Sequence, residues 1–396
     1  MGPQIGLVKN IRVLMILLGV WRLEIPNIPK FLAGCYTMYS VIIQIFYATF
    51  VISFSVELFK LFKTDIPTAL ENMSRLIFVS LLIIKVGICQ TKKVMELLRR
   101  SQLEEDEIIC QADYLISEIY KMHALYGFKL NLALSLTAVL TAVTLCIVGI
   151  QASYQFYRQY ININDTSETM DIPQMLPLWY PIIDRNKRHM LVMSHQIVQT
   201  LLTSLFTSVV QTFTNSILIF LRARLQILRI RFVNFSSVQV GETSNNEDEI
   251  PLRTLKHLCA YHQQLITSVE ELNDSLKYIL LLECSVTSIL LAALLTQILW
   301  RRYVAFNVAH FFLVVFQIMA LSWNSNEIAD QSSQLSNALY ESNWYVHSRK
   351  CKLLLLMMMR SQKPLVLTVG PLGPMTTQVG LSIVRLAYSY FSVMSS

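Results

Sequence analysis

The sequence predicts an all-α integral membrane protein with seven transmembrane helices, and three observations support this fold class. Hydrophobic residues make up 54% of the 396 residues and charged residues only 15%, which is too few charges to coat a soluble protein of this size. Seven segments are each apolar over about 20 residues, the length of helix that crosses a bilayer. One of them, residues 130–150, contains no charged side chain at all.

The predicted elements begin with residues 1–30, an uncleaved amphipathic segment that lies at the cytoplasmic membrane interface. Its apolar run ends before Pro26 and Pro29, and the chain that follows is itself long enough to cross the bilayer. Residues 31–325 then contain the first six spans, and residues 376–396 contain the seventh. The spans are predicted at residues 31–56, 72–90, 128–152, 190–221, 278–299, 303–323 and 376–394.

The second predicted span differs from the others because it carries two cationic side chains, Arg75 and Lys85. A charge is costly at the centre of a bilayer unless it has a partner or reaches the membrane surface. We therefore expect Arg75 to lie near a membrane interface and Lys85 to face a protein interior.

Three segments between spans are predicted to continue as helices outside the bilayer. Residues 91–127 are the first, with the acidic run Glu104 to Glu107 interpreted as a solvated turn. Apolar side chains at helical spacing from Leu255 to Leu272 predict an amphipathic helix that runs into the fifth span. Residues 326–375 hold the third. Packed together, these extensions would form a cytoplasmic domain able to hold subunits against each other.

The distribution of Lys and Arg predicts the orientation of the chain. With the N-terminus inside, the inner segments hold 22 of the 33 basic residues and the outer loops hold 8, as the positive-inside rule requires. Seven crossings then place the C-terminus outside. This orientation places the sequon at Asn164 outside, where it can be glycosylated, and the sequon at Asn234 inside. The net charge of +7 suits anionic membrane lipid and needs no nucleic-acid partner.

The sequence offers no pattern typical of an enzyme or a metal site. It contains none of the motifs that hold metals, nucleotides or nucleophiles, namely paired cysteines, His-Glu motifs and glycine-rich motifs. The histidine pairs are not spaced to share one helix face. We therefore predict no catalytic residue, no metal and no cofactor.

The last part of the chain contains Asn343-Trp344-Tyr345 and Lys363-Pro364-Leu365, and it ends with Ala387-Tyr388-Ser389-Tyr390-Phe391 shortly before the final residue. This order and spacing resemble the C-terminal signature of one membrane protein family, the insect odorant receptors. The Thr-Tyr to Gln-Phe ending typical of the related gustatory receptors is absent. Two weaker similarities are Leu18-Gly19-Val20-Trp21 near the start and the segment Leu176 to Pro181 before the fourth span.

The resemblance implies a tuning subunit that binds small, volatile, apolar odorants. Such a subunit assembles with the family's shared coreceptor, as a tetramer, into an odorant-gated cation channel of low selectivity in the plasma membrane of olfactory sensory neurons. It also implies that the cytoplasmic helices form an anchor domain that carries most contacts between subunits. The chain stops soon after Phe391, where the coreceptor continues with apolar gate residues, so we expect a partner to supply the gate.

Three other functions are weighed against this one. A metabotropic seven-helix chemoreceptor would need an inner-loop partner, but the triplet and the helix-seven motif of G-protein-coupled receptors are absent. A gustatory-type homomeric ligand-gated channel would need the other C-terminal pattern. A transporter would show paired interrupted half-helices, which the sequence does not suggest.

The seventh span carries polar side chains spaced three and four residues apart, which places them on one stripe of a helix. A hydroxyl stripe is hydrated if it faces an aqueous path, and the resemblance implies that this helix lines the cation pore. The other reading is that the small residues mediate tight helix packing. The candidate pore-lining residues are Ser382, Arg385, Ser389, Ser392 and Ser396.

Odorants should bind among the outer halves of the spans, because small apolar ligands occupy enclosed apolar pockets with few polar groups. The resemblance places this pocket between the second, third, fourth and sixth spans. The aromatic residues of this set are equally compatible with simple packing or with an interfacial aromatic belt. The candidate ligand-binding residues are Met73, Ile77, Leu145, Gly149, Ser153, Phe156, Met193, Ile197, Tyr303, Phe306, Asn307 and His310.

Overall fold

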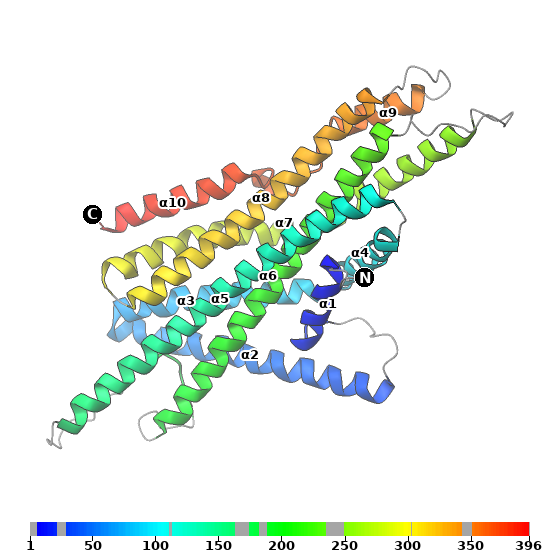
Figure 1. The fold of residues 1–396 in the computed structure, drawn as a ribbon. Coiled ribbons are helices and arrows are strands. Elements are labelled where there is room, and N and C mark those ends of the chain that lie inside the picture. The colour runs from blue at the N-terminus through cyan, green and yellow to red at the C-terminus, as the bar shows by residue number, and fades with distance from the viewer. Residues whose placement is uncertain are drawn as a thin grey trace.

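The structure, a computed structural model, describes residues 6–21, 29–110, 113–162, 174–181, 188–234, 249–301, 303–342 and 351–395. Within these ranges the chain is almost entirely helical, which confirms the predicted all-α class. Figure 1 shows long helices side by side in one elongated bundle. In order, the elements are α1 (Leu7–Leu17), α2 (Lys30–Thr64), α3 (Ile66–Cys89), α4 (Lys92–Cys110), α5 (Tyr114–Asn162), α6 (His189–Val233), α7 (Glu249–Leu299), α8 (Val304–Glu341), α9 (Cys351–Ser361), the short 3-10 turn η3 (Gly370–Leu372) and α10 (Thr377–Ser395).

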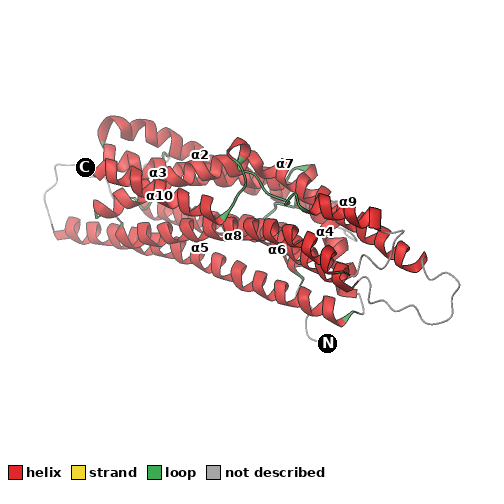
Figure 2. Ribbon diagram, turned by 90° about the horizontal axis from the view of Figure 1, so that it is seen from above, coloured by secondary structure: helices red, strands yellow, loops and turns green. Residues whose placement is uncertain are grey.

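Six helices in the described ranges are long and apolar enough to cross a membrane: α2, α3, α5, α6, α7 and α8. The seventh predicted span corresponds to α10, which is shorter and carries several serines and Arg385. It lies against α7 and α8 (Figure 2). The helices α5 to α8 extend well beyond the apolar segments that the sequence predicts, because their polar ends continue the same helices outside the bilayer.

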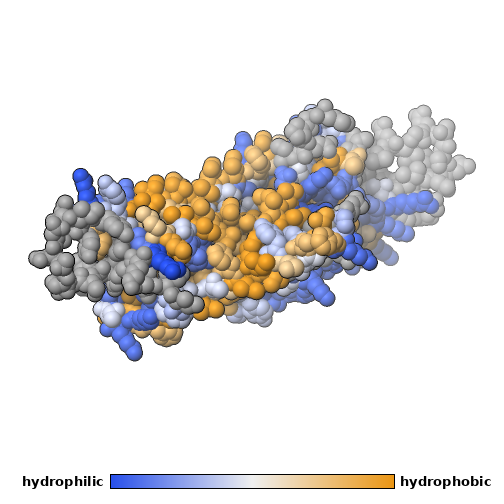
Figure 3. Space-filling model, turned by 90° about the horizontal axis from the view of Figure 1, so that it is seen from below, coloured by the Kyte–Doolittle hydropathy of each residue, from blue (hydrophilic) through white to orange (hydrophobic). Residues whose placement is uncertain are grey.

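Helix α6 forms the centre of the bundle, whereas α2 and α5 lie outside it. Most residues of α6 from Phe206 onward are buried, and α5, α8 and α1 pack around it. Large apolar side chains of α2 and α5 instead remain exposed, among them Ile42, Ile45 and Leu136. Figure 3 shows such apolar side chains as a band across the middle of the molecule, with hydrophilic residues toward the two ends. This pattern is typical of a surface that faces lipid.

The bundle has two distinct ends. We call the end with the α2–α3 turn, the α7–α8 turn and the segment 174–181 the cavity end, and the end with α1, α4 and α9 the α9 end. The three segments that the sequence predicts as helices outside the bilayer all lie at the α9 end.

The prediction of a solvated acidic turn at Glu104 to Glu107 is wrong. These residues are helical within α4, and Glu105 is buried. Its carboxylate accepts hydrogen bonds from the backbone N–H groups of Val8 and Lys9, at 3.0 and 2.9 Å, and from the Tyr120 hydroxyl. The first N–H groups of a helix lack partners within it and favour a negative charge. Glu105 thus caps α1 from a different helix.

The chain between α9 and α10 folds back and fixes the start of the last helix. The backbone N–H of Leu365 donates to the Ser332 hydroxyl at 2.8 Å, and the N–H of Thr368 donates to the Asn273 side chain at 2.7 Å. A tight turn follows, with Gly370 and Gly373 at positive φ, a conformation that glycine adopts readily. These contacts join α8 and α7 to the beginning of α10.

Candidate functional site

A cavity of about 80 Å³ lies inside the cavity end of the bundle. Helices α3, α5, α6 and α8 form its walls, as the resemblance implied, and α2 contributes a further side. The residues that line it are Phe50, Phe54, Arg75, Phe78, Val79, Ala138, Thr141, Ala142, Leu145, Leu176, Thr200, Thr203, Ser204, Thr207, Phe306, His310 and Leu313.

The wall of the cavity is apolar even where its residues carry hydroxyl groups. On α6, Thr200, Thr203 and Thr207 line the cavity at helical spacing. Each hydroxyl donates to the carbonyl four residues earlier in its own helix, at 2.8 to 2.9 Å. This local hydrogen bond satisfies the donor, so that the threonine methyl groups can contribute an apolar surface. The cavity therefore offers shape and apolar contact over most of its area.

Arg75 is the main exception to this apolar lining. It lies on α3, and its side chain is 6% exposed. The guanidinium group lies over the rings of Tyr303 and Phe306, with its carbon 5.6 and 5.5 Å from the ring centroids. Its nearest carboxylate is Glu71, one turn earlier, at 3.9 Å. The Nε and Nη2 atoms have no hydrogen-bond partner, although both are strong donors.

Arg75 thus faces the interior of the bundle, where two aromatic rings and Glu71 together stabilise the cation. The expectation that it lies near a membrane interface stays a prediction. Tyr303, which precedes the first residue of α8, has a backbone in the left-handed region, with φ 41°. This conformation costs energy for a residue other than glycine.

His310 is the second polar group of the cavity. It is buried one turn after Phe306 on α8, and its ring contacts Phe78 edge-on at 4.9 Å and Phe306 at 5.4 Å between centroids. Neither ring nitrogen has a hydrogen-bond partner. Arg75 and His310 thus both line the cavity, both contact Phe306, and both carry buried polar atoms without a hydrogen-bond partner.

Residues 174–181, which we call the cover loop, close one side of the cavity. Leu176 reaches the lining, and its backbone is held by Gln196 of α6, whose side chain accepts from the Leu176 N–H at 3.2 Å and donates to its carbonyl at 2.8 Å. Asn72 donates to the Pro177 carbonyl at 3.0 Å. Met175 packs on Gly149, where an added Cβ would lie 2.4 Å from its Cγ. The glycine therefore leaves room for the cover loop.

The structure brings together only part of the predicted ligand-binding set. Leu145, Phe306 and His310 line the cavity. Tyr303 is not among the lining residues, but its ring contacts the lining residue Arg75. Asn307 and Ser153 are buried nearby, and Ser153 donates to the carbonyl of Gly149 at 3.1 Å. The remaining residues are half-buried on the same helices and are not among the lining residues: Met73, Ile77, Phe156, Met193 and Ile197.

The sequence reasoning missed several lining residues. Phe50 and Phe54 of α2 were not considered because the resemblance named four other helices. Arg75 and Phe78 were missed although Phe78 lies next to the selected Ile77, since one step along a helix turns a side chain by about 100°. A charged residue within an apolar span was the available signal for Arg75, because such residues usually serve a function.

Two smaller cavities lie toward the middle of the bundle, and Phe78 and Thr207 border the first of them. Both are lined by Lys85 of α3 and Glu283 of α7, whose side chains form an ion pair. Lys85 therefore faces a protein interior, as expected. Gln211 lines the same two cavities. The ion pair connects a wall helix of the main cavity to α7, the helix on which α10 packs.

Helix α10 shows a buried face and an exposed face. Ile383 and Ala387 are buried against the neighbouring helices, and Ala387 packs with apolar residues of α7 and α8. Ser382, Arg385, Ser389 and Ser392 are exposed, whereas Ser396 lies outside the described residues. Two of the serine hydroxyls, in Ser382 and Ser389, donate to carbonyls four residues earlier. The described part of the predicted polar stripe thus lies on the side of α10 that the described helices leave uncovered.

Comparisons with known proteins agree on one family. A family model described as 7tm odorant receptor matches residues 65–388. Odorant receptor 10 of Aedes albopictus is 32% identical over 158 residues, 39% of this chain and 42% of that protein. Odorant receptor Or2 of Anopheles gambiae is 31% identical over 144 residues, 35% of this chain and 38% of that protein. The match therefore spans less than half the length of these two relatives.

Two solved structures share the fold over nearly the whole chain. The insect olfactory receptor OR5 from Machilis hrabei superposes with a TM-score of 0.80 at 14% identity, covering 98% of this chain and 97% of that one. The same receptor in complex with eugenol superposes with a TM-score of 0.78 at 15% identity and the same coverage. At this identity the similarity establishes the fold of the bundle.

Proposed function

The chain belongs to the 7tm odorant receptor family, and on that premise we propose that it is the odorant-binding, tuning subunit of a heteromeric odorant-gated, non-selective cation channel. As a member of that family it is a multi-pass membrane receptor rather than an enzyme. The observation that carries the proposal is the cavity at one end of the bundle. Most of its exposed lining surface is apolar, and Arg75 and His310 are the ionisable residues among those that line it, as expected for a site that binds small volatile molecules.

The exposed polar stripe on α10 supports a channel. Ser382, Arg385, Ser389 and Ser392 lie on the face that the described helices of this chain do not cover. We propose that this face, together with Ser396, lines a pore formed with other subunits, where water hydrates the hydroxyl groups. The partner is the family coreceptor in a tetramer, which the resemblance implies. Main-chain and side-chain contacts from α7 and α8 would then carry the effect of a bound odorant to α10.

We assign the parts of the chain accordingly. Residues 1–30 form the amphipathic cytoplasmic segment, residues 31–325 the six spans around the odorant cavity, residues 326–375 the anchor helices, and residues 376–396 the pore helix. The cavity end is extracellular and the α9 end cytoplasmic, as the 22 to 8 distribution of basic residues favours. The protein belongs in the plasma membrane of olfactory sensory neurons.

The central experiment is to express the chain with and without the coreceptor and to record current while applying a panel of volatile compounds, with no nucleotide in the pipette. We expect odorant-evoked cation current only when both subunits are present. The control is the coreceptor alone, which should not respond to the same panel. A response that requires intracellular GTP would contradict the channel mechanism and support a metabotropic receptor.

The orientation has a separate test. Asn164 lies outside the described residues, in the loop that we place outside the cell, whereas Asn234 ends α6 at the α9 end. We expect a glycosidase-sensitive mass shift that Asn164→Gln removes and Asn234→Gln leaves in place. The reverse result would invert the topology.

A further inference from the structure

We propose that the cavity selects neutral odorants that carry a hydrogen-bond-accepting oxygen, such as ketones, aldehydes and esters, and that Arg75 and His310 recognise this oxygen. The inference rests on the proposed odorant-binding function and adds the chemical class of the ligand. It follows from the polar atoms that the cavity leaves without partners.

Arg75 provides the acceptor preference. Its guanidinium group can only donate hydrogen bonds, and its Nε and Nη2 atoms are buried without an acceptor. Such donors are unfavourable in a low-dielectric interior. A ligand that brings an oxygen to this corner of the cavity satisfies a charged donor, whereas a pure hydrocarbon leaves it unsatisfied. Hydrogen bonds to charged groups are also stronger than those between neutral groups.

Glu71 explains why the acceptor should be neutral. Its carboxylate lies 3.9 Å from the Arg75 Nη2 atom, and its side chain is only 2% exposed. The pair is close to electrically balanced, so a carboxylate ligand would add a second negative charge beside the first. Like charges that share a buried site repel each other strongly. A carbonyl oxygen gains the hydrogen bond without this repulsion.

His310 completes the polar corner. Both of its ring nitrogens lack partners, and its ring is fixed by contacts with Phe78 and Phe306. In its neutral form an imidazole has one donor and one acceptor nitrogen. It can therefore donate to the second lone pair of a carbonyl oxygen that Arg75 already binds. The phenylalanines around this corner, including Phe50 and Phe54, provide contact area for the apolar remainder of the ligand.

The experiment compares sets of volatiles that have the same shape and differ only at one group. One such set is acetophenone, 1-phenylethanol, cumene and benzoate, and equivalent aliphatic sets are included. Currents of the chain with its coreceptor are measured as dose-response curves and normalised to surface-labelled protein. We expect the carbonyl compound of the responding set to be at least about tenfold more potent than its hydrocarbon and carboxylate counterparts, with the alcohol between them.

Two variants test the residues. The first combines Glu71→Gln with Arg75→Met and removes both charges, so that no uncompensated charge remains buried. The second, His310→Phe, keeps the aromatic contacts and removes the ring nitrogens. We expect each to lower the carbonyl-to-hydrocarbon potency ratio toward one. Ile84→Met, an exposed position on α3, is the control and should leave the ratio unchanged.

The outcomes separate the inference from the proposed function. Three results would overturn the inference and leave the odorant receptor function standing. They are odorant-gated currents in which carbonyls and hydrocarbons are equally potent, currents in which carboxylates are most potent, and a carbonyl-to-hydrocarbon ratio that both variants leave intact. If neither variant reaches the surface, the potency order of the unmodified chain still decides. No current with any volatile would overturn the proposed function, and this inference with it.

Discussion

The two ends of the bundle hold a buried arginine differently. At the α9 end, Arg224 of α6 is fully buried and forms an ion pair with Glu104 of α4, while its Nε atom donates to the Tyr261 hydroxyl at 3.1 Å. Its Nη2 atom has no hydrogen-bond partner. At the cavity end, Arg75 has Glu71 only at 3.9 Å, and its Nε and Nη2 atoms have no hydrogen-bond partner. Protein groups thus hold the first guanidinium through a close ion pair and a hydrogen bond, whereas the second has neither.

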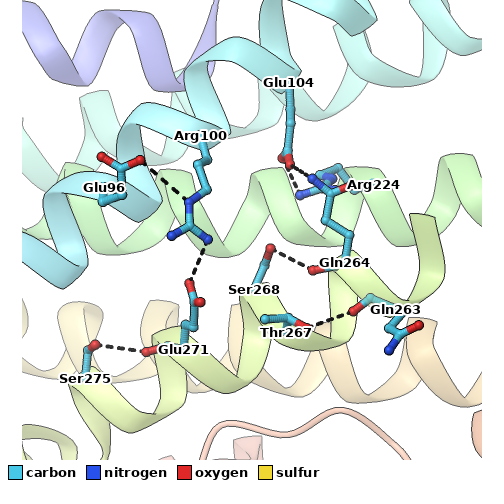
Figure 4. A network of polar contacts seen from close by, with 10 residues as sticks. All are labelled: Glu96, Arg100, Glu104, Arg224, Gln263, Gln264, Thr267, Ser268, Glu271 and Ser275. Atoms are coloured by element: carbon cyan, nitrogen blue, oxygen red, sulfur yellow. Dashed lines mark hydrogen bonds and ion pairs between the residues drawn. The ribbon is translucent and has the colours of Figure 1, made fainter. Parts of the chain in front are cut away.

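Figure 4 shows that the Arg224 ion pair belongs to a wider network at the α9 end. Arg100 of α4 lies 3.3 Å from Glu271 of α7, and Gln264 donates to Glu104 at 2.7 Å. Burial raises the pKa of the Glu104 carboxyl above its ordinary value, while the neighbouring Arg224 acts in the opposite direction. The network joins α4, α6 and α7, as expected for a rigid anchor. The comparison predicts that polar groups closed by protein partners determine stability, whereas those open to the cavity determine ligand response.

The largest effect on stability should follow from breaking the ion pair between Lys85 and Glu283, which lies between the two ends. Lys85→Met leaves a carboxylate buried without its partner, and such a loss typically costs about 3–5 kcal/mol. We expect a strong loss of surface protein and of thermal stability in detergent. Lys85→Met combined with Glu283→Gln should recover most of it, because no unpaired charge remains.

The control for this prediction is Lys93→Met, a change of the same kind at an exposed position of α4, which should be nearly neutral. If Lys85→Met alone is as stable as the double variant, the ion pair is not a closed structural contact, and the comparison between the two kinds of buried charge fails at this site.

The second prediction concerns the cap on α1. Glu105→Ala removes the acceptor for the Val8 and Lys9 N–H groups and for the Tyr120 hydroxyl. Loss of charged hydrogen bonds to buried donors should destabilise the protein by about 2–4 kcal/mol. Hydrogen exchange should show increased opening of residues 7–17, and surface expression should decrease. Glu107→Ala, an exposed neighbour in the same helix, should change neither quantity, and equal effects of the two variants would refute the capping role.

These contacts also show where sequence reasoning stopped. The spans, the helical extensions and the family were predicted because hydropathy and the C-terminal residues carry that information locally. The face of each span that points inward was not predicted, because both faces of a lipid-embedded helix are apolar. The hydrophobic periodicity that reveals the core-facing side of a helix in water is therefore weak in a span. Three of the candidate ligand-binding residues, Leu145, Phe306 and His310, line the cavity, and their role in binding stays a prediction. The positions of Phe50 and Arg75 depend on how five helices and the cover loop meet. The burial of Glu105 depends likewise on α1, a partner 96 residues away along the chain.

A third prediction tests the open side of the comparison. Phe306→Leu removes the ring that contacts both Arg75 and His310 while keeping an apolar side chain. We expect the concentration for half-maximal odorant response to rise by about 5- to 30-fold, since one aromatic contact and part of a cation–π interaction, about 1–2 kcal/mol, are lost. Surface protein should remain close to that of the unchanged chain.

Phe312→Leu is the matched control, because Phe312 lies on the same helix and is 63% exposed. It should leave the half-maximal concentration unchanged. An unshifted midpoint in Phe306→Leu, together with reduced surface protein, would mean that Phe306 serves packing or membrane insertion and would remove α8 from the ligand site.

The smallest effect on the odorant response is expected at Gly149, where the cover loop contacts α5. In Gly149→Ala the new Cβ would lie 2.4 Å from the Cγ of Met175, so this side chain must move and the loop that carries Leu176 into the cavity must shift with it. The new atom meets the Cβ of Met175 as well, at 2.6 Å, so a rotation of the outer side chain does not relieve the overlap, and the cost should be about 1–3 kcal/mol. A helical Gly→Ala change otherwise gains up to about 1 kcal/mol.

Gly87→Ala supplies the matched control, because an added Cβ there meets no atom within 4 Å. We expect Gly149→Ala to be the less stable of the two variants, and a few-fold faster decay of current after odorant removal in Gly149→Ala only, because a displaced cover loop retains ligand less well. Identical decay in the two variants would show that Met175 fills space beside the cavity without controlling access to it.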